Sequence, residues 1–448
     1  MKRKIIDELI KWKEDKNRKP LIVHGARQVG KTYVIREFGK GHYKNIIYVN
    51  FEIDLELAKD FTDNISPEFI VNRMELYFGE TIKKGETLIF FDEIQACGRA
   101  LTSLKYFCED APEYHVIAAG SLLGVAINKE KYSFPVGKVS MMNLYPMDFE
   151  EFLWAQGREL VANEIRRCYS SNEEMSQSIH GLCMEQYKTY LIVGGMPGVI
   201  KRYIEEQKVI ETQVVKNEIL SSYTADMSKY ATNSEATKIK ASYDSIPSQL
   251  AKDNKKFQYK VIQKGGTATM FGEAIHWLEA AGVVLKCFKI EHGHMPPRAY
   301  RDLSSFKLYM SDIGLLTLKA NLPLHALMSS DTNNSTFIGA LTENYVAQAL
   351  LNNGFDLHYW TSKDTAEVDF VIQKESDIIP VEVKANENVK SRSLSVYISK
   401  YKPPYAIRIS AKNFGFENNI KSVPLYAVFC IENKNEKKTE MFGLVRIT

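Results

Sequence analysis

An eight-residue segment near the start of the chain has the residue types and spacing that bind phosphate groups. It reads Gly25, Ala26, Arg27, Gln28, Val29, Gly30, Lys31 and Thr32, which fits G-x-x-x-x-G-K-[ST] at every fixed position. Glycines let the backbone fold around phosphate oxygens, and the helix that follows adds the positive end of its dipole. We predict that Lys31 reaches the β and γ phosphates and that the Thr32 hydroxyl binds Mg²⁺. A glycine turn carrying a surface lysine is the weaker alternative.

Two acids follow a buried apolar strand predicted at residues 88–91. Asp92 fits the partner of Mg²⁺, and Glu93 fits the base that orients and polarises the attacking water. Ser121 follows the next strand, where it serves either the γ phosphate and that water or the start of a helix as an N-cap. Asn50, at the end of an earlier strand, is predicted to hydrogen-bond Glu93 and hold it out of line.

A second set of charged residues lies far along the chain. Glu382 and Lys384 end the apolar strand at 378–383 on one face, and Asp369 lies within a neighbouring apolar strand. A charged residue in such a strand needs a partner or a metal ion. Two or three acids and a lysine on adjacent strands match the pattern of restriction-endonuclease-like nucleases, with Glu343 on an upstream helix as a further member. Mg²⁺ or Mn²⁺ would suit these oxygen ligands, with Lys384 positioning the water. An inactive nuclease fold or a structural ion pair is the alternative.

Four short apolar segments position the phosphate-binding residues. They lie at residues 21–23, 46–49, 88–91 and 116–119 and alternate with helical stretches, which predicts an α/β fold with a parallel sheet. We divide the chain into four parts: 1–155 as the P-loop core, 156–235 as a helical lid or linker, 236–328 as a winged-helix module of two helices and a hairpin, and 335–448 as the nuclease-like domain.

The chain resembles a large family of bacterial and archaeal AAA-type ATPases that carry a C-terminal domain of unknown function. The resemblance rests on 25–32, 92–95 and 119–121, and it extends through 144–152, 194–197, 306–316 and 367–370 over nearly the whole chain. It implies that the nucleotide is ATP. Many relatives have an arginine ahead of the segment at 144–146, where it would act as an arginine finger. This chain has Lys138 there, which can neutralise the charge of a phosphate but cannot make the bidentate contact of an arginine.

Lysines and aromatic residues are interleaved within the predicted winged helix. The lysines are Lys252, Lys255, Lys256, Lys260 and Lys264, and the aromatic residues are Phe257 and Tyr259. Such a cluster either contacts DNA phosphates or forms a solvated helix face. Trp277 is predicted to belong to the core.

Composition excludes several classes of protein. The 448 residues are 45% hydrophobic and 25% charged, which is typical of a globular protein, and the net charge of +3 does not indicate a nucleic-acid protein. The sequence contains no apolar run of membrane-spanning length and no signal-peptide pattern, and its six cysteines are scattered without a CxxC pair. We therefore expect a cytoplasmic protein without a disulfide framework.

These patterns favour an ATP-hydrolysing protein coupled to a C-terminal nuclease-like domain that acts on DNA. The main alternative is a nucleotide-dependent switch that binds a protein partner without cleavage. A DNA-binding protein without cleavage is a third possibility. A homo-oligomer is compatible with each of them.

Overall fold

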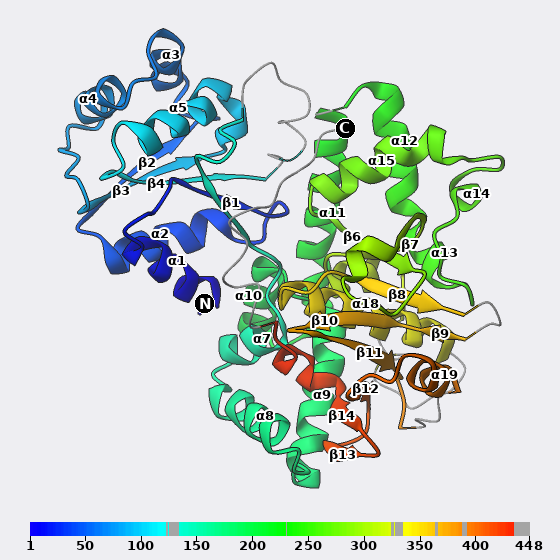
Figure 1. Ribbon diagram of the computed structural model, residues 1–448. Helices are drawn as coiled ribbons and strands as arrows, with labels where there is room; N and C mark the ends of the chain where they lie inside the picture. The colour runs from blue at the N-terminus through cyan, green and yellow to red at the C-terminus, as the bar shows by residue number, and fades with distance from the viewer. Residues whose placement is uncertain are drawn as a thin grey trace. The chain divides into compact units, whose positions relative to one another are not determined.

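The computed structural model describes residues 1–121, 124, 134–229, 231–323, 327, 335–362, 366–387 and 392–433 (Figure 1). These residues form two compact units. The N-terminal unit holds Arg3–Tyr145 and Ala280–Gly282, and the C-terminal unit holds Met1–Lys2, Pro146–Glu279 and the described residues from Val283 onward. No helix of the described chain is both long enough and apolar enough to cross a membrane.

A five-stranded parallel sheet forms the centre of the N-terminal unit. Its strands, in spatial order, are β2 (Asn45–Asn50), β3 (Thr87–Asp92), β4 (His115–Gly120), β1 (Leu21–His24) and β5 (Ser140–Asn143). The four predicted strands and the parallel sheet are confirmed. The fifth strand, β5, was not predicted because it is a partly exposed edge strand without an apolar run.

Helices cover both faces of this sheet, as the α/β prediction requires (Figure 1). They are α1 (Ile5–Glu14), α2 (Lys31–His42), α3 (Leu55–Asp63), α4 (Pro67–Phe78) and α5 (Gly98–Glu109), with a short 3₁₀ helix η1 (Ile94–Ala96) after β3. Alternate side chains of the strands, such as Ile89 and Phe91, pack in one core with Phe61, Met74 and Leu104 of α3–α5. Because the strands are covered on both sides, their carboxyl ends form the accessible edge where ligands bind in this architecture.

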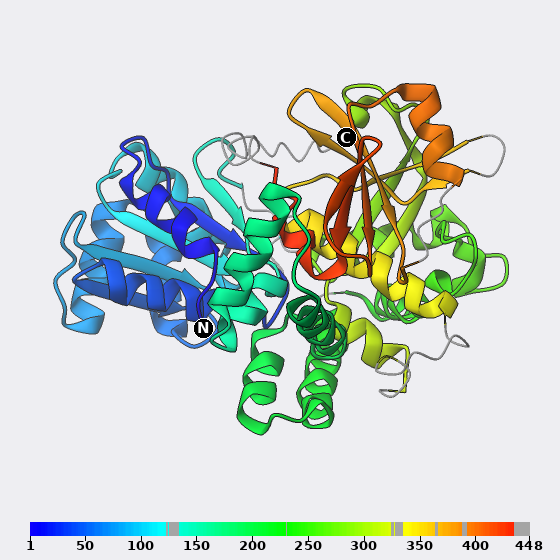
Figure 2. The same ribbon diagram turned by 90° about the horizontal axis from the view of Figure 1, so that it is seen from below.

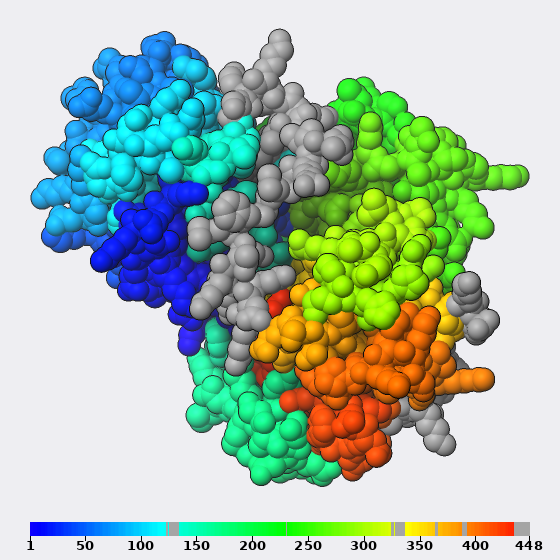
Figure 3. Space-filling model, in the orientation of Figure 1, coloured from blue at the N-terminus to red at the C-terminus, as the bar shows by residue number. Residues whose placement is uncertain are grey.

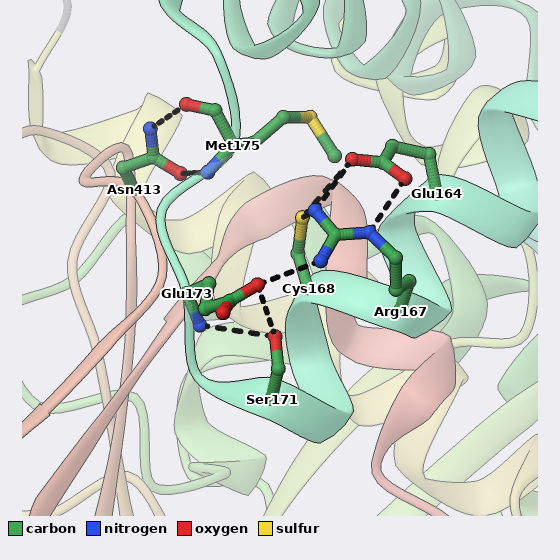
Figure 4. A network of polar contacts seen from close by, with 7 residues as sticks. All are labelled: Glu164, Arg167, Cys168, Ser171, Glu173, Met175 and Asn413. Carbon is green, nitrogen blue, oxygen red and sulfur yellow. Dashed lines mark hydrogen bonds and ion pairs between the residues drawn. The ribbon is translucent and has the colours of Figure 1, made fainter.

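The C-terminal unit begins with helices, and those from α8 to α11 lie in the segment 156–235 that we predicted as a helical lid or linker. The helices of this unit are α7 (Phe149–Ala155), α8 (Glu159–Ser171), α9 (Gln177–Val193), α10 (Pro197–Glu206), α11 (Thr212–Lys229), α12 (Asn233–Asp244), α13 (Ile246–Leu250), α14 (Tyr259–Ile262), α15 (Ala268–Ala280), α16 (Ile313–Lys319), α18 (Ser335–Asn352) and α19 (Arg392–Tyr401). Polar contacts order the end of α8, where Arg167 and Cys168 both contact Glu164 (Figure 4). Beyond α8, Asn413 exchanges two hydrogen bonds with the backbone of Met175, at 3.0 and 2.7 Å, and so ties the helical segment to the C-terminal strands.

Two sheets complete the C-terminal unit. One has the order β10 (Phe370–Lys374), β11 (Asp377–Val383), β12 (Ala406–Ser410), β14 (Ile420–Pro424), β13 (Gly415–Glu417), and the other has β7 (Arg301–Met310), β6 (Val284–Ile290), β8 (His358–Thr361), β9 (Glu367–Val368). Helix α18 (yellow in Figure 2) contacts strands of both sheets, β6 and β7 in one and β11 in the other. In Figure 3, α19 and the β13–β14 hairpin appear in orange and red at the surface.

The region predicted as a winged helix differs from the sequence prediction in two ways. The helix expected at 246–255 ends at Leu250, because Gln249 hydrogen-bonds both the N–H and the C=O of Gln258 and closes a turn. The expected strand pair is present as β6 and β7, but β6 also pairs in parallel with β8. The pair is therefore part of a four-stranded sheet.

Asp312 joins three of the segments on which the family resemblance rests. Its carboxylate accepts hydrogen bonds from the backbone N–H groups of Gly195 (2.6 Å) and Leu315 (2.9 Å), and Met147 N donates to Gly195 O at 2.7 Å. A Cβ at Gly195 would lie 2.1 Å from the Met147 carbonyl oxygen, so only glycine allows this approach. These segments thus have a structural role inside the C-terminal unit.

Candidate nucleotide site and a buried acid–lysine cluster

The phosphate-binding segment connects β1 to α2 at the carboxyl edge of the parallel sheet. Gly30 starts α2 with φ at 94°, a left-handed value that favours glycine, and Gln28 is also left-handed at 68°. A Cβ at Gly25 would lie 2.1 Å from the Leu144 carbonyl oxygen. Ala26 and Val29 are buried, whereas Arg27 and Gln28 lie nearer the solvent. Both fixed glycines of the motif are therefore required by the backbone.

The Lys31 ammonium group is held by the loop itself. Its Nζ donates to the carbonyl oxygens of Gly25 (2.8 Å) and Ala26 (2.9 Å), and the residue is buried. Because a buried ammonium group needs acceptors, these carbonyls satisfy the charge in the absence of other ligands. Phosphate oxygens are negatively charged and therefore accept stronger hydrogen bonds from the Lys31 ammonium group than these carbonyls do.

Asp92 and Thr32 meet beside the loop. Thr32 Oγ1 donates to Asp92 Oδ2 at 2.7 Å, and Tyr48 Oη donates to the same oxygen at 3.0 Å. Asp92 is buried at the end of β3. A hydroxyl and a carboxylate in contact form the hard-oxygen donor pair that suits Mg²⁺, so these residues fit the ion.

Glu93 follows Asp92 in a left-handed conformation, with φ at 49°. Its Oε2 accepts a hydrogen bond from Gln95 Nε2 at 2.5 Å. The side-chain amide of Asn50, which we expected to hold Glu93, instead donates to Tyr48 Oη at 3.3 Å. Gln95 therefore restrains the Glu93 carboxylate in this structure.

Ser121 lies at the carboxyl ends of the strands of the parallel sheet, whereas Lys138 lies at their amino ends. Ser121 is buried directly after β4, whose last residue Gly120 lies beside His24 of β1, so Ser121 is at the edge from which the phosphate loop leaves. Lys138 precedes β5, whose Ser140 lies beside Leu21 at the start of β1. The Lys138 ammonium pairs with Glu109 at 2.7 Å. Lys138 is therefore not at the phosphate site of its own chain.

Glu343 is the centre of a buried charge network in the C-terminal unit. Its carboxylate contacts Lys255 Nζ, Lys307 Nζ (2.8 Å) and Tyr309 Oη, and the fully buried Lys307 also pairs with Glu367 at 2.6 Å. Burial alone would raise the pKa of Glu343, but Lys255 and Lys307 outweigh it and hold that pKa well below the ordinary range. The network thus keeps Glu343 ionised.

Asp369 and Glu382 lie close to this network and to each other. Asp369 separates β9 from β10, and its Oδ2 accepts a hydrogen bond from Val383 N at 2.8 Å. Burial, followed by the charges of Glu343 and Glu382, raises the pKa of Asp369 to about 7. Lys384 Nζ pairs with Glu382 Oε1 at 2.7 Å.

The four predicted residues of the C-terminal set therefore lie together, but as an acid–lysine cluster. Within the described part of the chain, no group of three or more His, Cys, Asp or Glu side chains is arranged to hold a metal ion. Glu343 in particular has two ammonium groups and a hydroxyl at its oxygens. A divalent ion bound by Glu343 does not fit this arrangement.

Two of the residues considered for DNA contacts are engaged inside the unit. Lys255 belongs to the acid–lysine cluster, and Phe257 is buried and stacks on Phe306 with ring centres 5.3 Å apart. Trp277 is buried, as predicted. Lys255 and Phe257 therefore make contacts within the unit and do not form a solvated helix face, and the DNA contacts of this segment stay a prediction.

Several residues of both sites were missed by the sequence analysis: Arg3, Tyr48, Gln95, Lys307 and Tyr309. A signal existed for Lys307, because it is a lone lysine within the apolar run 306–310 and shares a strand face with Tyr309. Tyr48 shares a strand face with Asn50 in the same way. Arg3, whose guanidinium group donates to Val29 O of the phosphate loop at 3.0 Å, carries no local signal at all.

Comparison with known proteins finds a family match for the part of the chain that contains the phosphate-binding segment. Residues 17–153 match the model of an AAA domain. These residues are similar to an AAA domain, and their parallel five-stranded sheet is an α/β fold. Residues 184–325 match a domain of unknown function (DUF8612) and residues 338–428 another (DUF4143), so the winged-helix and nuclease-like assignments stay predictions. No curated protein matches the sequence.

Three solved structures illustrate the similarity, each at low sequence identity. A Walker-type ATPase of Pyrococcus abyssi is 15% identical over 71% of this chain and 95% of that chain, with a TM-score of 0.43. The ORC2 protein of Aeropyrum pernix, in ADPNP–ADP complexes, is 10% identical over 75% and 90%, with a TM-score of 0.31. AMPPCP-bound DnaA from Aquifex aeolicus is 13% identical over 61% and 86%, with a TM-score of 0.25. The assignment of the AAA domain rests on the family match.

The raised pKa of Asp369 predicts a pH dependence of stability. Between pH 4 and 7 the folded protein holds a proton on Asp369 that the unfolded chain, with an ordinary pKa of 3.8, has released. Asp369 therefore contributes stability that is complete below about pH 4 and is lost as the pH rises through 7. Asp369→Asn keeps an acceptor for Val383 N and cannot ionise, so we expect it to gain stability over wild type between pH 5 and 8.

Urea unfolding of both proteins in EDTA-containing buffer measures this difference. Subtracting the two curves cancels the opposite contribution of His358, whose pKa burial and Arg301 lower to about 4. Exposed Asp377, changed to Asn, is the matched control. Parallel curves for wild type and Asp369→Asn would contradict the assignment.

Proposed function

We propose that the protein binds ATP with Mg²⁺ at residues 25–32 and hydrolyses it. The observation that carries this proposal is the 2.7 Å contact of Thr32 Oγ1 with Asp92 Oδ2 beside the buried Lys31, within a domain that matches the AAA model. Lys31 exchanges its carbonyl partners for phosphate oxygens, and Thr32 and Asp92 hold the ion. When bound, Mg²⁺ neutralises charge on the β and γ phosphates.

Glu93 orients and polarises the attacking water in this proposal. Its position directly after Asp92 supports the role, and the hydrogen bond from Gln95 restrains it until nucleotide is bound. Ser121, at the same edge of the sheet, contacts the γ phosphate or that water. Asn50 acts only through Tyr48, which holds Asp92.

Lys138 acts on a neighbouring copy of the chain in this proposal. Its distance from its own phosphate loop and its partial exposure support a role in a homo-oligomer, where it would neutralise charge on the neighbour's γ phosphate. The ion pair with Glu109 keeps the side chain in place in the single chain.

The C-terminal unit binds a partner without cleaving it. The cluster contains four carboxylates (Glu343, Glu367, Asp369, Glu382) and three ammonium groups (Lys255, Lys307, Lys384). A proton on Asp369, whose pKa is near 7, balances the charges, so the cluster has no need of a divalent ion. The nucleotide state of the AAA domain would then control binding of a protein partner.

Metal-dependent DNA cleavage is the second candidate. It is favoured by the meeting of Asp369, Glu382 and Lys384 where β10 begins and β11 ends, which is the predicted order of a nuclease-like site. DNA binding through the hairpin module would accompany it. Either function suits a reducing compartment, the cytoplasm being our proposal, because the six cysteines are scattered along the sequence without a CxxC pair.

Substitutions in the AAA domain separate binding from hydrolysis. Lys31→Ala should abolish tight MgATP binding, because the charge on the phosphates is lost. Glu93→Gln should keep binding and lower kcat by about 100-fold or more, since an amide cannot act as a base. Lys40→Ala and Glu37→Gln, which change an exposed pair on α2, are the controls. Titration calorimetry and phosphate release measure both effects, and a wild-type rate in Glu93→Gln would show that the base is misassigned.

The role of Lys138 predicts a dependence on assembly. Lys138→Ala should lower kcat at concentrations where the protein is oligomeric and leave nucleotide affinity nearly unchanged. Lys138→Arg should restore or raise the rate. Lys105→Ala removes a nearby exposed lysine that also pairs with Glu109, as a control. An equal loss of activity in dilute monomer would exclude action on a neighbour.

The cluster predicts the absence of cleavage. Wild-type protein with Mn²⁺ or Mg²⁺ should leave supercoiled plasmid intact, and DNA should not stimulate the ATPase. Asp369→Ala and Glu382→Ala should lower the melting temperature without changing ATP hydrolysis, with Asp356→Ala as a control for the loss of an ion-paired acid of the same unit. If wild-type protein cleaves DNA with Mn²⁺, and if Asp369→Ala and Glu382→Ala lose this activity while Asp356→Ala keeps it, the second candidate function, DNA cleavage, is favoured instead.

A further inference from the structure

Arg3 lies outside the residues that match the AAA domain, yet it contacts the phosphate loop. Its guanidinium group donates to Val29 O at 3.0 Å and to Tyr145 O at 2.7 Å, and the residue is 6% exposed. Both acceptors are backbone carbonyls of the N-terminal unit. A guanidinium group suits this position because its planar fork of donors can hold two fixed oxygens at once.

The Val29 carbonyl belongs to the same peptide group as the N–H of Gly30. In a trans peptide the C=O and the N–H point in opposite directions, so a hydrogen bond that fixes one fixes the other. Gly30 has φ at 94° and no Cβ, so its own conformational preferences do not prevent rotation of this peptide. Arg3 supplies the restraint that glycine lacks.

The orientation of that N–H matters because backbone amides of this loop form the cradle for the phosphates. If the Val29–Gly30 peptide turned over, it would direct a carbonyl oxygen where the phosphate oxygens lie. The opposite end of the loop is fixed independently, by the close approach of Gly25 to Leu144. The loop is thus fixed at both ends: Gly25 packs against Leu144, and Arg3 links the Val29 carbonyl to the carbonyl of Tyr145.

We propose that Arg3 is a positioning residue of the ATP site: it holds the Val29 carbonyl so that the Gly30 N–H faces the bound phosphates. The inference rests on the proposed binding of ATP. Because β-phosphate contacts are common to ATP and ADP, loss of Arg3 weakens both nucleotides. The catalytic group Glu93 and its neighbours on β3 do not contact Arg3 in the described hydrogen bonds, so kcat at saturating ATP is preserved.

Three variants test this role by titration calorimetry with MgATP and MgADP and by steady-state hydrolysis. Arg3→Met, which keeps the length and removes the donors, should raise the Kd of both nucleotides about tenfold. It should raise KM in proportion and change kcat less than about twofold. Arg3→Lys should be intermediate, because an ammonium group lacks the planar fork. Arg18→Met is the matched control, since Arg18 also donates to backbone carbonyls of the unit, Lys13 O, Asp15 O and Pro112 O.

The outcomes are distinct. Wild-type Kd values in folded Arg3→Met, or equal weakening in Arg18→Met, would overturn the inference and leave Arg3 a structural residue. If Arg3→Met does not fold, Arg3→Lys decides, and wild-type affinity in that variant is the contradicting result. Failure of wild-type protein to bind MgATP would overturn the proposed function itself, and this inference with it.

Discussion

The buried Asp92, Lys31 and Glu343 each have polar partners, and both candidate sites are built around that requirement. The buried Asp92 carboxylate has Thr32 and Tyr48, and the Lys31 ammonium has two carbonyls of its own loop. In the C-terminal unit, Glu343 has Lys255, Lys307 and Tyr309. Removing such a partner costs several kcal/mol unless another ligand replaces it. A bound ligand must therefore offer better partners than the protein does.

The two sites differ in how easily a ligand can meet that condition. At the phosphate loop, Lys31 is held by neutral carbonyls, and charged phosphate oxygens are better acceptors, so nucleotide should displace them. At Glu343, the partners are already charged ammonium groups, one of them fully buried. A divalent ion would have to displace these lysines and leave them buried without acceptors. This difference leads us to expect ATP at the first site and no metal-dependent chemistry at the second.

Local sequence patterns predicted the parts of the molecule that are contiguous in the chain. The loop at 25–32, the acids after β3 and the four central strands are each defined by neighbouring residues, and Asp369, Glu382 and Lys384 stand out from two apolar strands. Pairs that join distant segments were not predictable in this way. Arg3 and Tyr145 are 142 residues apart, and Lys255 and Glu343 are 88 apart. Local sequence does not distinguish a surface lysine from a buried one, because the acid that pairs with the buried lysine comes from a distant segment of the chain. The edge strand β5 was missed because its residues alternate between half-buried and exposed positions and form no apolar run.

The most direct test of the account is a crystal structure of the protein with Mg²⁺ and a non-hydrolysable ATP analogue. We expect Lys31 Nζ to leave the Gly25 and Ala26 carbonyls and contact the β and γ phosphates. The Thr32 hydroxyl should leave Asp92 and bind the ion at about 2.1 Å. The account would be contradicted if the analogue, at a saturating concentration, were absent from the loop. It would also be contradicted if Lys31 Nζ still contacted its two carbonyls beside a bound analogue.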